Sequence, residues 1–130
     1  MVTVLIVDDS RTSRRFLRNM LTEAGYEVVA EAVDGEDGMK KYEEFKPDIV
    51  TMDITMPGTD GIEALGRIRD YDKNAKVIMV SALGQQHKVM EALDLGAKSY
   101  ILKPITKEKI LAVIKQVAGS EGDFSLSQRM

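Results

Sequence analysis

The sequence contains no cysteine, no tryptophan and a single histidine, His87. Without cysteine there is no disulfide, no thiolate nucleophile, no zinc–cysteine site and no iron–sulfur cluster. One histidine is also too few for a histidine-based metal site. The first apolar run, Val2–Val7, is short and is followed at once by acidic residues, which excludes a signal peptide or membrane span there. We therefore expect a cytoplasmic protein that does not contact a membrane.

The chain also has no excess of basic residues. Its 18 Lys and Arg are outnumbered by 21 Asp and Glu, which gives a formal net charge of −3. Proteins that bind the phosphate backbone of nucleic acid present a basic surface, so we do not expect direct nucleic-acid binding. With 130 residues the chain is long enough for one domain and too short for a large two-domain enzyme.

Five short runs of apolar and β-branched residues predict strands. They are Val2–Val7, Val28–Ala32, Asp48–Met52, Lys76–Val80 and Ser99–Leu102. The first, third and fourth runs are almost continuously apolar, which is typical of parallel strands that are covered on both faces. The segments between the runs show helical spacing of apolar residues. The pattern is therefore (βα)5, an α/β fold with an open parallel sheet.

Helix boundaries are marked by capping and terminating residues. In the first helix the residues expected on the buried stripe are Phe16, Leu17, Met20, Leu21 and Ala24. Gly25 and Gly96 are expected to end the first and fourth helices, and Pro47 follows the second. Asp60 and Thr106 are expected to cap the third and fifth. After Ala118 the periodicity ends, so we predict a domain over residues 1–118 and a tail or linker over 119–130.

Polar and charged residues follow four of the five predicted strands. They are Asp8 and Asp9, Asp53, Ser81, and Lys103. In open α/β sheets ligands bind beyond the carboxyl ends of the strands, so these side chains mark the expected site. Three converging carboxylates require a hard cation, and Mg²⁺ fits best, with Mn²⁺ able to substitute. A carboxylate nucleophile, a cation, a lysine and a hydroxyl form a set suited to phosphoryl transfer, although spacing alone does not decide which Asp is the nucleophile.

Four motifs in this order resemble those of the response-regulator receiver domain, and the resemblance extends from Val2 to about Ala118. They are LIVDDS at Leu5–Ser10, PDIVTMDITMPGTDG at Pro47–Gly61, MVSA at Met79–Ala82 and GAKSYILKP at Gly96–Pro104. Within that family, the motifs most resemble those of single-domain, CheY-like chemotaxis regulators. The fold implied is a flavodoxin-like three-layer sandwich with strand order 2-1-3-4-5.

The resemblance also implies a role for each site residue. Asp53 is the expected phosphoacceptor. Asp9, Asp8, Asp53 and the Thr55 backbone carbonyl are the expected metal ligands, Asp8 mainly through water. Lys103 and Ser81 are expected to bind the phosphoryl group, Ser81 and Tyr100 to move as a switch, and Pro104 to follow a cis peptide.

Other residues permit two interpretations. Tyr100 is either the switch aromatic or an ordinary packed residue of a half-exposed strand. Arg11, Arg14, Arg15 and Arg18 lie on one face of the first helix, which is either a solvated face or a docking surface for an acidic kinase or phosphotransfer partner. His87 is expected to be exposed and without chemistry. Leu83 cannot hydrogen-bond an attacking water, which favours slow self-dephosphorylation.

The leading hypothesis is a signalling switch that takes a phosphoryl group from a histidine kinase or phosphotransfer domain. Its own phosphoryl transfer and dephosphorylation would be its only catalysis. Its target would bind the face formed by the fourth helix, fifth strand and fifth helix, and a phosphatase is a possible further partner. The alternatives are a receiver excised from a methylesterase or DNA-binding regulator and, more weakly, a haloacid-dehalogenase-type phosphatase, whose Asp-x-Asp signature is missing after the first strand.

Overall fold

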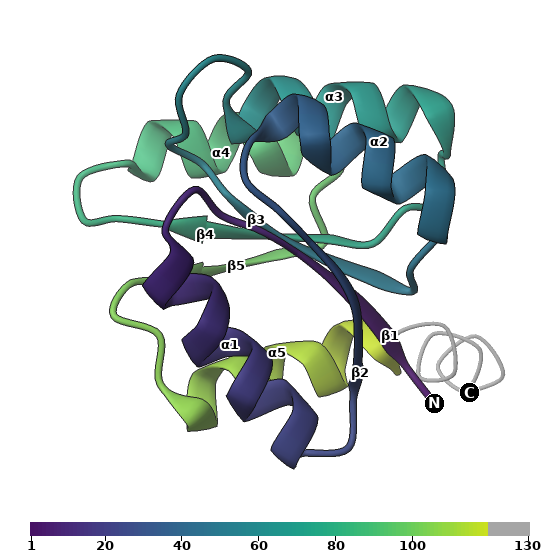
Figure 1. Ribbon diagram of the computed structural model, residues 1–130. Helices are drawn as coiled ribbons and strands as arrows, with labels where there is room; N and C mark the ends of the chain where they lie inside the picture. The colour runs from purple at the N-terminus through teal and green to yellow at the C-terminus, as the bar shows by residue number, and fades with distance from the viewer. Residues whose placement is uncertain (120–130) are drawn as a thin grey trace, which may run out of the picture.

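The computed structural model describes residues 1–119, and these form a central sheet covered on both faces by helices (Figure 1). The tail predicted for 119–130 lies, from residue 120 on, outside the described residues. The strands are β1 (Thr3–Val7), β2 (Glu27–Ala32), β3 (Ile49–Asp53), β4 (Val77–Ser81) and β5 (Ser99–Leu102). The helices are α1 (Arg11–Glu23), α2 (Gly35–Phe45), α3 (Gly61–Tyr71), α4 (Gln86–Asp94) and α5 (Lys107–Ala118).

The sheet is parallel throughout its five strands, with the order β2-β1-β3-β4-β5, so the predicted fold class and strand order are confirmed. The order reverses between β1 and β3, which lie side by side with Val7 opposite Met52. The predicted strand boundaries were close: β3 and β4 each begin and end one residue later than expected. That shift makes Asp53 and Ser81 the last residues of their strands.

Two apolar layers explain why the central strands are continuously hydrophobic. Successive side chains of a strand point to opposite faces. Leu5 and Val7 of β1 therefore belong to the layer beneath α2, α3 and α4, whereas Val4 and Ile6 belong to the layer beneath α1 and α5 (Figure 1). All four are essentially without solvent exposure, so both faces of the strand need an apolar residue.

Four of the five helices begin at a residue whose side chain caps the helix, and these caps fix the residue at which each of the four helices starts. The caps are Ser10, Asp34, Asp60 and Thr106, and each accepts a hydrogen bond from the backbone N–H three residues later. Such a bond satisfies one of the amide groups that a helix start leaves unpaired. The predicted caps at Asp60 and Thr106 are therefore confirmed.

The stripe predicted for the first helix was too wide. Leu17, Met20 and Leu21 are buried, but Phe16 is 51% exposed and Ala24 is also exposed. Phe16 instead lines a surface pocket together with Pro104 and Ile105, and a single apolar side chain at the surface is common. Across residues 1–119, none of the helices combines the length and the apolar character needed to cross a membrane.

Candidate functional site

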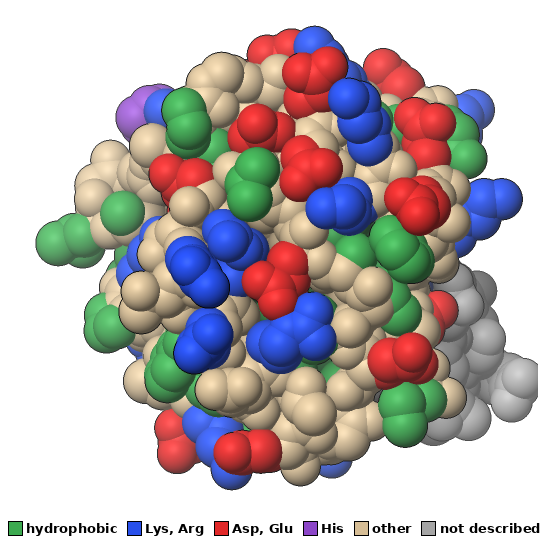
Figure 2. All heavy atoms as spheres, viewed as in Figure 1, with side chains coloured by type: hydrophobic (Ala, Val, Ile, Leu, Met, Phe, Trp, Pro, Cys, Tyr) green, Lys and Arg blue, Asp and Glu red, His purple; other side chains and the backbone are tan. Residues whose placement is uncertain are grey.

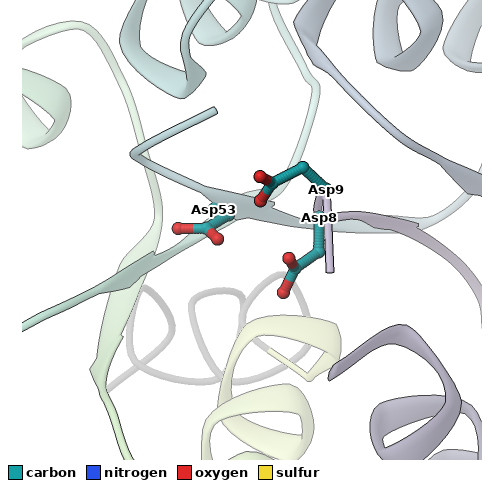
Figure 3. Close-up of side chains that lie close together, drawn as sticks. All are labelled: Asp8, Asp9 and Asp53. Carbon is teal, nitrogen blue, oxygen red and sulfur yellow. The ribbon is translucent and has the colours of Figure 1, made fainter. Parts of the chain in front are cut away.

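Three carboxylates meet at the point where the strand order reverses. Asp8 and Asp9 follow β1 directly, and Asp53 ends β3, its immediate neighbour in the sheet. Figure 3 shows the three side chains close together at this edge, and one carboxylate oxygen of each lies within 4.8 Å of the others. The three carboxylates among the expected metal ligands are therefore brought together.

Burial makes this cluster unfavourable when all its members are charged. Asp8 is 2% exposed and Asp53 is 5% exposed, whereas Asp9 is exposed. The pKa of Asp8 is raised to about 6, mainly by burial and also by the neighbouring Asp53 and Asp9 carboxylates, while the Ser10 N–H and Lys103 act in the opposite direction. Oxygen ligands carrying excess negative charge suit a divalent cation such as Mg²⁺, so the donor set fits the expected metal.

Lys103 supplies the positive charge on the other side of Asp53. Its Nζ lies 3.2 Å from Asp53 Oδ2, while the Thr55 backbone N–H donates to Asp53 Oδ1 at 3.3 Å. The peptide bond between Lys103 and Pro104 is cis. The backbone N–H of Lys103 donates to the Ser81 carbonyl at 2.8 Å, which ties the end of β5 to the end of β4. Asp53 is thus held between two donors from different segments.

Gly61 allows α3 to start directly against Asp53. Its backbone N–H donates to the Ile54 carbonyl at 2.9 Å, and a Cβ at this position would lie 2.1 Å from the backbone oxygen of Asp53. No other residue type fits this contact without moving the backbone. Sequence reasoning included Gly61 in a motif but did not assign it this role.

Arg14 braces the loop that carries Asp8 and Asp9. Its Nη1 donates to the Asp8 backbone carbonyl at 2.7 Å, and its Nε donates to Glu31 at 3.1 Å. Arg18 pairs with the other carboxylate oxygen of Glu31 at 2.5 Å, and the two arginines together lower the pKa of Glu31, against the opposing effect of burial. The Arg14 side chain is only 13% exposed, so this residue is not part of a freely solvated face.

The other two arginines of the predicted stripe contribute to a basic surface over α1. Arg11 and Arg15 are exposed, and Figure 2 shows Lys and Arg side chains gathered over this helix around an acidic one. Together with Arg14, Arg18, Asn19 and Glu31 they line a shallow depression. The structure therefore divides the predicted stripe: Arg14 and Arg18 bind Glu31, whereas Arg11 and Arg15 are exposed.

Gln85 is a second residue that sequence reasoning missed. Its side-chain amide accepts a hydrogen bond from the Ala82 N–H and donates one to the Thr55 hydroxyl. It therefore connects the loop after β4 with the loop after β3. A glutamine near a loop of this kind carries no local pattern that would reveal the contact.

Ser81 is the last residue of β4, and Tyr100 lies on the neighbouring strand β5, opposite Met79. Ser81 is 1% exposed, and Tyr100 is 48% exposed, so Tyr100 is not packed in the core. Both line an apolar groove between α4 and β5 together with Met90 and Leu102. His87 is exposed near the start of α4, as expected.

This arrangement suits nucleophilic attack by a carboxylate on phosphorus. Asp53 offers an oxygen that is held in place by its strand, and Lys103 can neutralise charge that develops on the transferred group. A metal bound by the acidic cluster would neutralise further charge on the phosphoryl oxygens.

Known proteins share both the sequence and the fold. The family model described as response regulator receiver domain matches residues 4–115. The chemotaxis protein CheY of Thermotoga maritima is 49% identical over 115 residues, which covers 88% of this chain and 96% of that protein. A methylesterase/glutaminase of Trichodesmium erythraeum is 41% identical, but the match covers 87% of this chain and only 34% of the relative. CheY in a CheX–CheY–BeF3–Mg²⁺ complex of Borrelia burgdorferi is 44% identical, with a TM-score of 0.84 over 88% of this chain and 87% of that one.

Proposed function

The chain belongs to the response regulator receiver family and is CheY-like, and on that basis we propose that Asp53 is phosphorylated in a Mg²⁺-dependent reaction. The observation that supports this proposal best is the position of Asp53. It lies buried at the switch point, within 4.8 Å of two further carboxylates and 3.2 Å from the Lys103 ammonium group. Close carboxylates repel one another when charged, so this arrangement lowers the stability of the fold unless a bound cation offsets the charge.

In the proposed reaction an Asp53 carboxylate oxygen attacks the phosphorus of a phosphohistidine. The new O–P bond forms as the P–N bond breaks, and the histidine nitrogen leaves with the electron pair and accepts a proton. Lys103 pairs with the transferred group, and the Ser81 hydroxyl donates to it. Asp8, Asp9 and Asp53 would hold the metal together with the Thr55 backbone carbonyl, and Mn²⁺ would replace Mg²⁺.

Phosphorylation would then alter which partners the protein binds. The donor would be a sensor histidine kinase or phosphotransfer domain, and the target would bind the α4–β5–α5 face, with Ser81 and Tyr100 linking that face to the site. The groove between α4 and β5 supports this assignment, since it reaches from Ser81 to Tyr100. A phosphatase would be a further partner, and the complex from Borrelia burgdorferi shows that a similar CheY also binds CheX. The setting would be chemotaxis signalling in the cytoplasm.

The receiver would span residues 1–118. A second candidate is a receiver that belongs to a longer regulator, because the methylesterase relative carries a matching segment over about a third of its length. The CheY relative is more similar and is covered almost completely, which favours the single-domain form. The family match over residues 4–115 leaves no support for a haloacid-dehalogenase-type phosphatase.

The test is intact-mass analysis after incubation with acetyl phosphate, with and without Mg²⁺. We expect one phosphoryl adduct in the wild type that requires Mg²⁺ and is lost in Asp53→Asn. Asp70→Asn, which alters an exposed carboxylate of α3, is the matched control and should keep the adduct. An adduct that persists in Asp53→Asn, or the absence of any adduct in the wild type, would contradict the proposal.

A further inference from the structure

The loop between β4 and α4 is tied across the site by a single side chain. The Gln85 Oε1 accepts a hydrogen bond from the Ala82 backbone N–H at 2.7 Å, and its Nε2 donates to the Thr55 hydroxyl at 2.6 Å. Ala82 directly follows Ser81, and Thr55 lies two residues after Asp53. One amide group therefore joins the two loops that follow the acceptor carboxylate and the phosphoryl-binding hydroxyl.

The start of α4 shows that this amide is not used to begin the helix. The other four helices of the described chain each start at a side-chain cap, whereas Gln85 precedes α4 and makes no capping bond. Glutamine is not among the residues favoured at this position. Its side chain instead turns back over the loop, where Gly84, at a φ of +89°, allows the chain to reverse. The contact costs α4 a cap, which indicates that it serves the loops.

Phosphorylation of Asp53 would disturb this contact. The Ser81 side chain is buried, and it lies at the end of β4 beside the strand that carries Asp53. A phosphoryl group on Asp53 would enter the space between the ends of these two strands, next to the backbone that follows Ser81. The Ala82 N–H is the first group of that backbone, and in the structure it is bound to Gln85.

From this geometry we propose that Gln85 is a latch, a positioning residue that holds the β4–α4 loop in the unphosphorylated arrangement. The proposal rests on the function proposed for Asp53. Because the latch stabilises only the resting arrangement, its removal enlarges the population of molecules able to take up a phosphoryl group. The apparent affinity for a phosphoryl analogue then rises by the same factor.

The experiment is a titration of the full chain with beryllium fluoride, an analogue of the phosphoryl group, in the presence of Mg²⁺, with the bound fraction followed by ¹⁹F NMR. Gln85→Ala removes both hydrogen bonds, and Thr55→Val removes the one between the loops. We expect tighter binding in both variants, by about three- to tenfold in Gln85→Ala, as the loss of one or two exposed hydrogen bonds implies. The double variant should bind no more tightly than Gln85→Ala.

Two further variants separate the latch from a general loosening of the helix. Gln85→Ser removes the latch but offers α4 a favoured cap, so it should bind the analogue as tightly as Gln85→Ala does. Gln86→Ala changes the exposed neighbouring glutamine and should bind like the wild type. Unchanged or weaker binding in Gln85→Ala, or wild-type affinity in Gln85→Ser, overturns the latch. A wild type that binds no analogue at all would instead refute the proposed phosphorylation of Asp53, and the latch with it.

Discussion

The clearest quantitative consequence of the site concerns Asp8. This carboxylate is 2% exposed, and burial is the main reason why its pKa rises from 3.8 to about 6. The folded state therefore holds the Asp8 proton more tightly than the unfolded state does. The stabilisation that this proton provides is complete below the ordinary pKa and is lost as the pH rises through about 6. At neutral pH and without metal, the charged Asp8 destabilises the fold.

Asp8→Asn keeps the size of the side chain and removes its charge. The difference between the two pKa values corresponds to at most about 3 kcal/mol at a pH well above 6. Water reaches the outer part of the cluster through the exposed Asp9, so we expect a gain of about 1–3 kcal/mol in the free energy of unfolding at about pH 8. At about pH 4.5 the same linkage leaves a gain of roughly 1 kcal/mol or less.

The assay is urea unfolding followed by circular dichroism, in EDTA, at both pH values. Asp70→Asn serves as the control for removing an exposed negative charge and should change the free energy of unfolding little. Added Mg²⁺ should stabilise the wild type more than Asp8→Asn, because it neutralises the charge that the variant lacks. The reasoning is refuted if metal-free Asp8→Asn is no more stable than the wild type at the higher pH, or if its advantage does not shrink at the lower one.

Three further changes give predictions of known sign. Among residues 1–119 the buried Thr51 hydroxyl finds no hydrogen-bond partner, so Thr51→Val should raise the free energy of unfolding by about 1 kcal/mol in urea titrations; a loss of stability would show that the hydroxyl is satisfied. Gly61→Ala should lower the free energy of unfolding by about 2–3 kcal/mol and slow phosphorylation, because the new Cβ would overlap the Asp53 carbonyl. Its control is Gly66→Ala, which has open space around it and should be neutral or stabilising. Leu83 is 81% exposed and apolar, so Leu83→Glu should shorten the phosphoryl lifetime in radiolabel decay assays; slower decay in the variant would contradict this.

The fold could be predicted because its signals are local. Continuous apolar runs marked the covered parallel strands, and Asp60 and Thr106 marked helix starts through side chains that reach only three residues. The exposure of Phe16 was missed because helical spacing does not show how far a neighbouring layer extends. That limit depends on where α1 meets the sheet, which is a property of the assembled molecule.

The site residues likewise fall into those that a pattern in the sequence shows and those that it does not. Asp8 and Lys103 follow strands and Asp53 ends one, and the rule that strand ends meet at one edge was enough to predict that they lie together. Arg14 and Gln85 were not found as site residues, since each acts on a backbone group or hydroxyl of a distant segment. Contacts of this kind are long-range in sequence and leave no periodicity.

The contacts of Arg14 and Gln85 differ in strength, and this difference indicates which loop of the site can move. Arg14 is largely buried and binds both the Asp8 carbonyl and the Glu31 carboxylate, which is an arrangement of charge-assisted hydrogen bonds in a protected position. Gln85 makes neutral hydrogen bonds at exposed positions, next to a glycine with positive φ and before a helix without a side-chain cap. Such bonds contribute less and open more readily. A phosphoryl group on Asp53 should therefore be accommodated by movement of the β4–α4 loop, while the loop that carries Asp8 and Asp9 keeps the metal ligands in place.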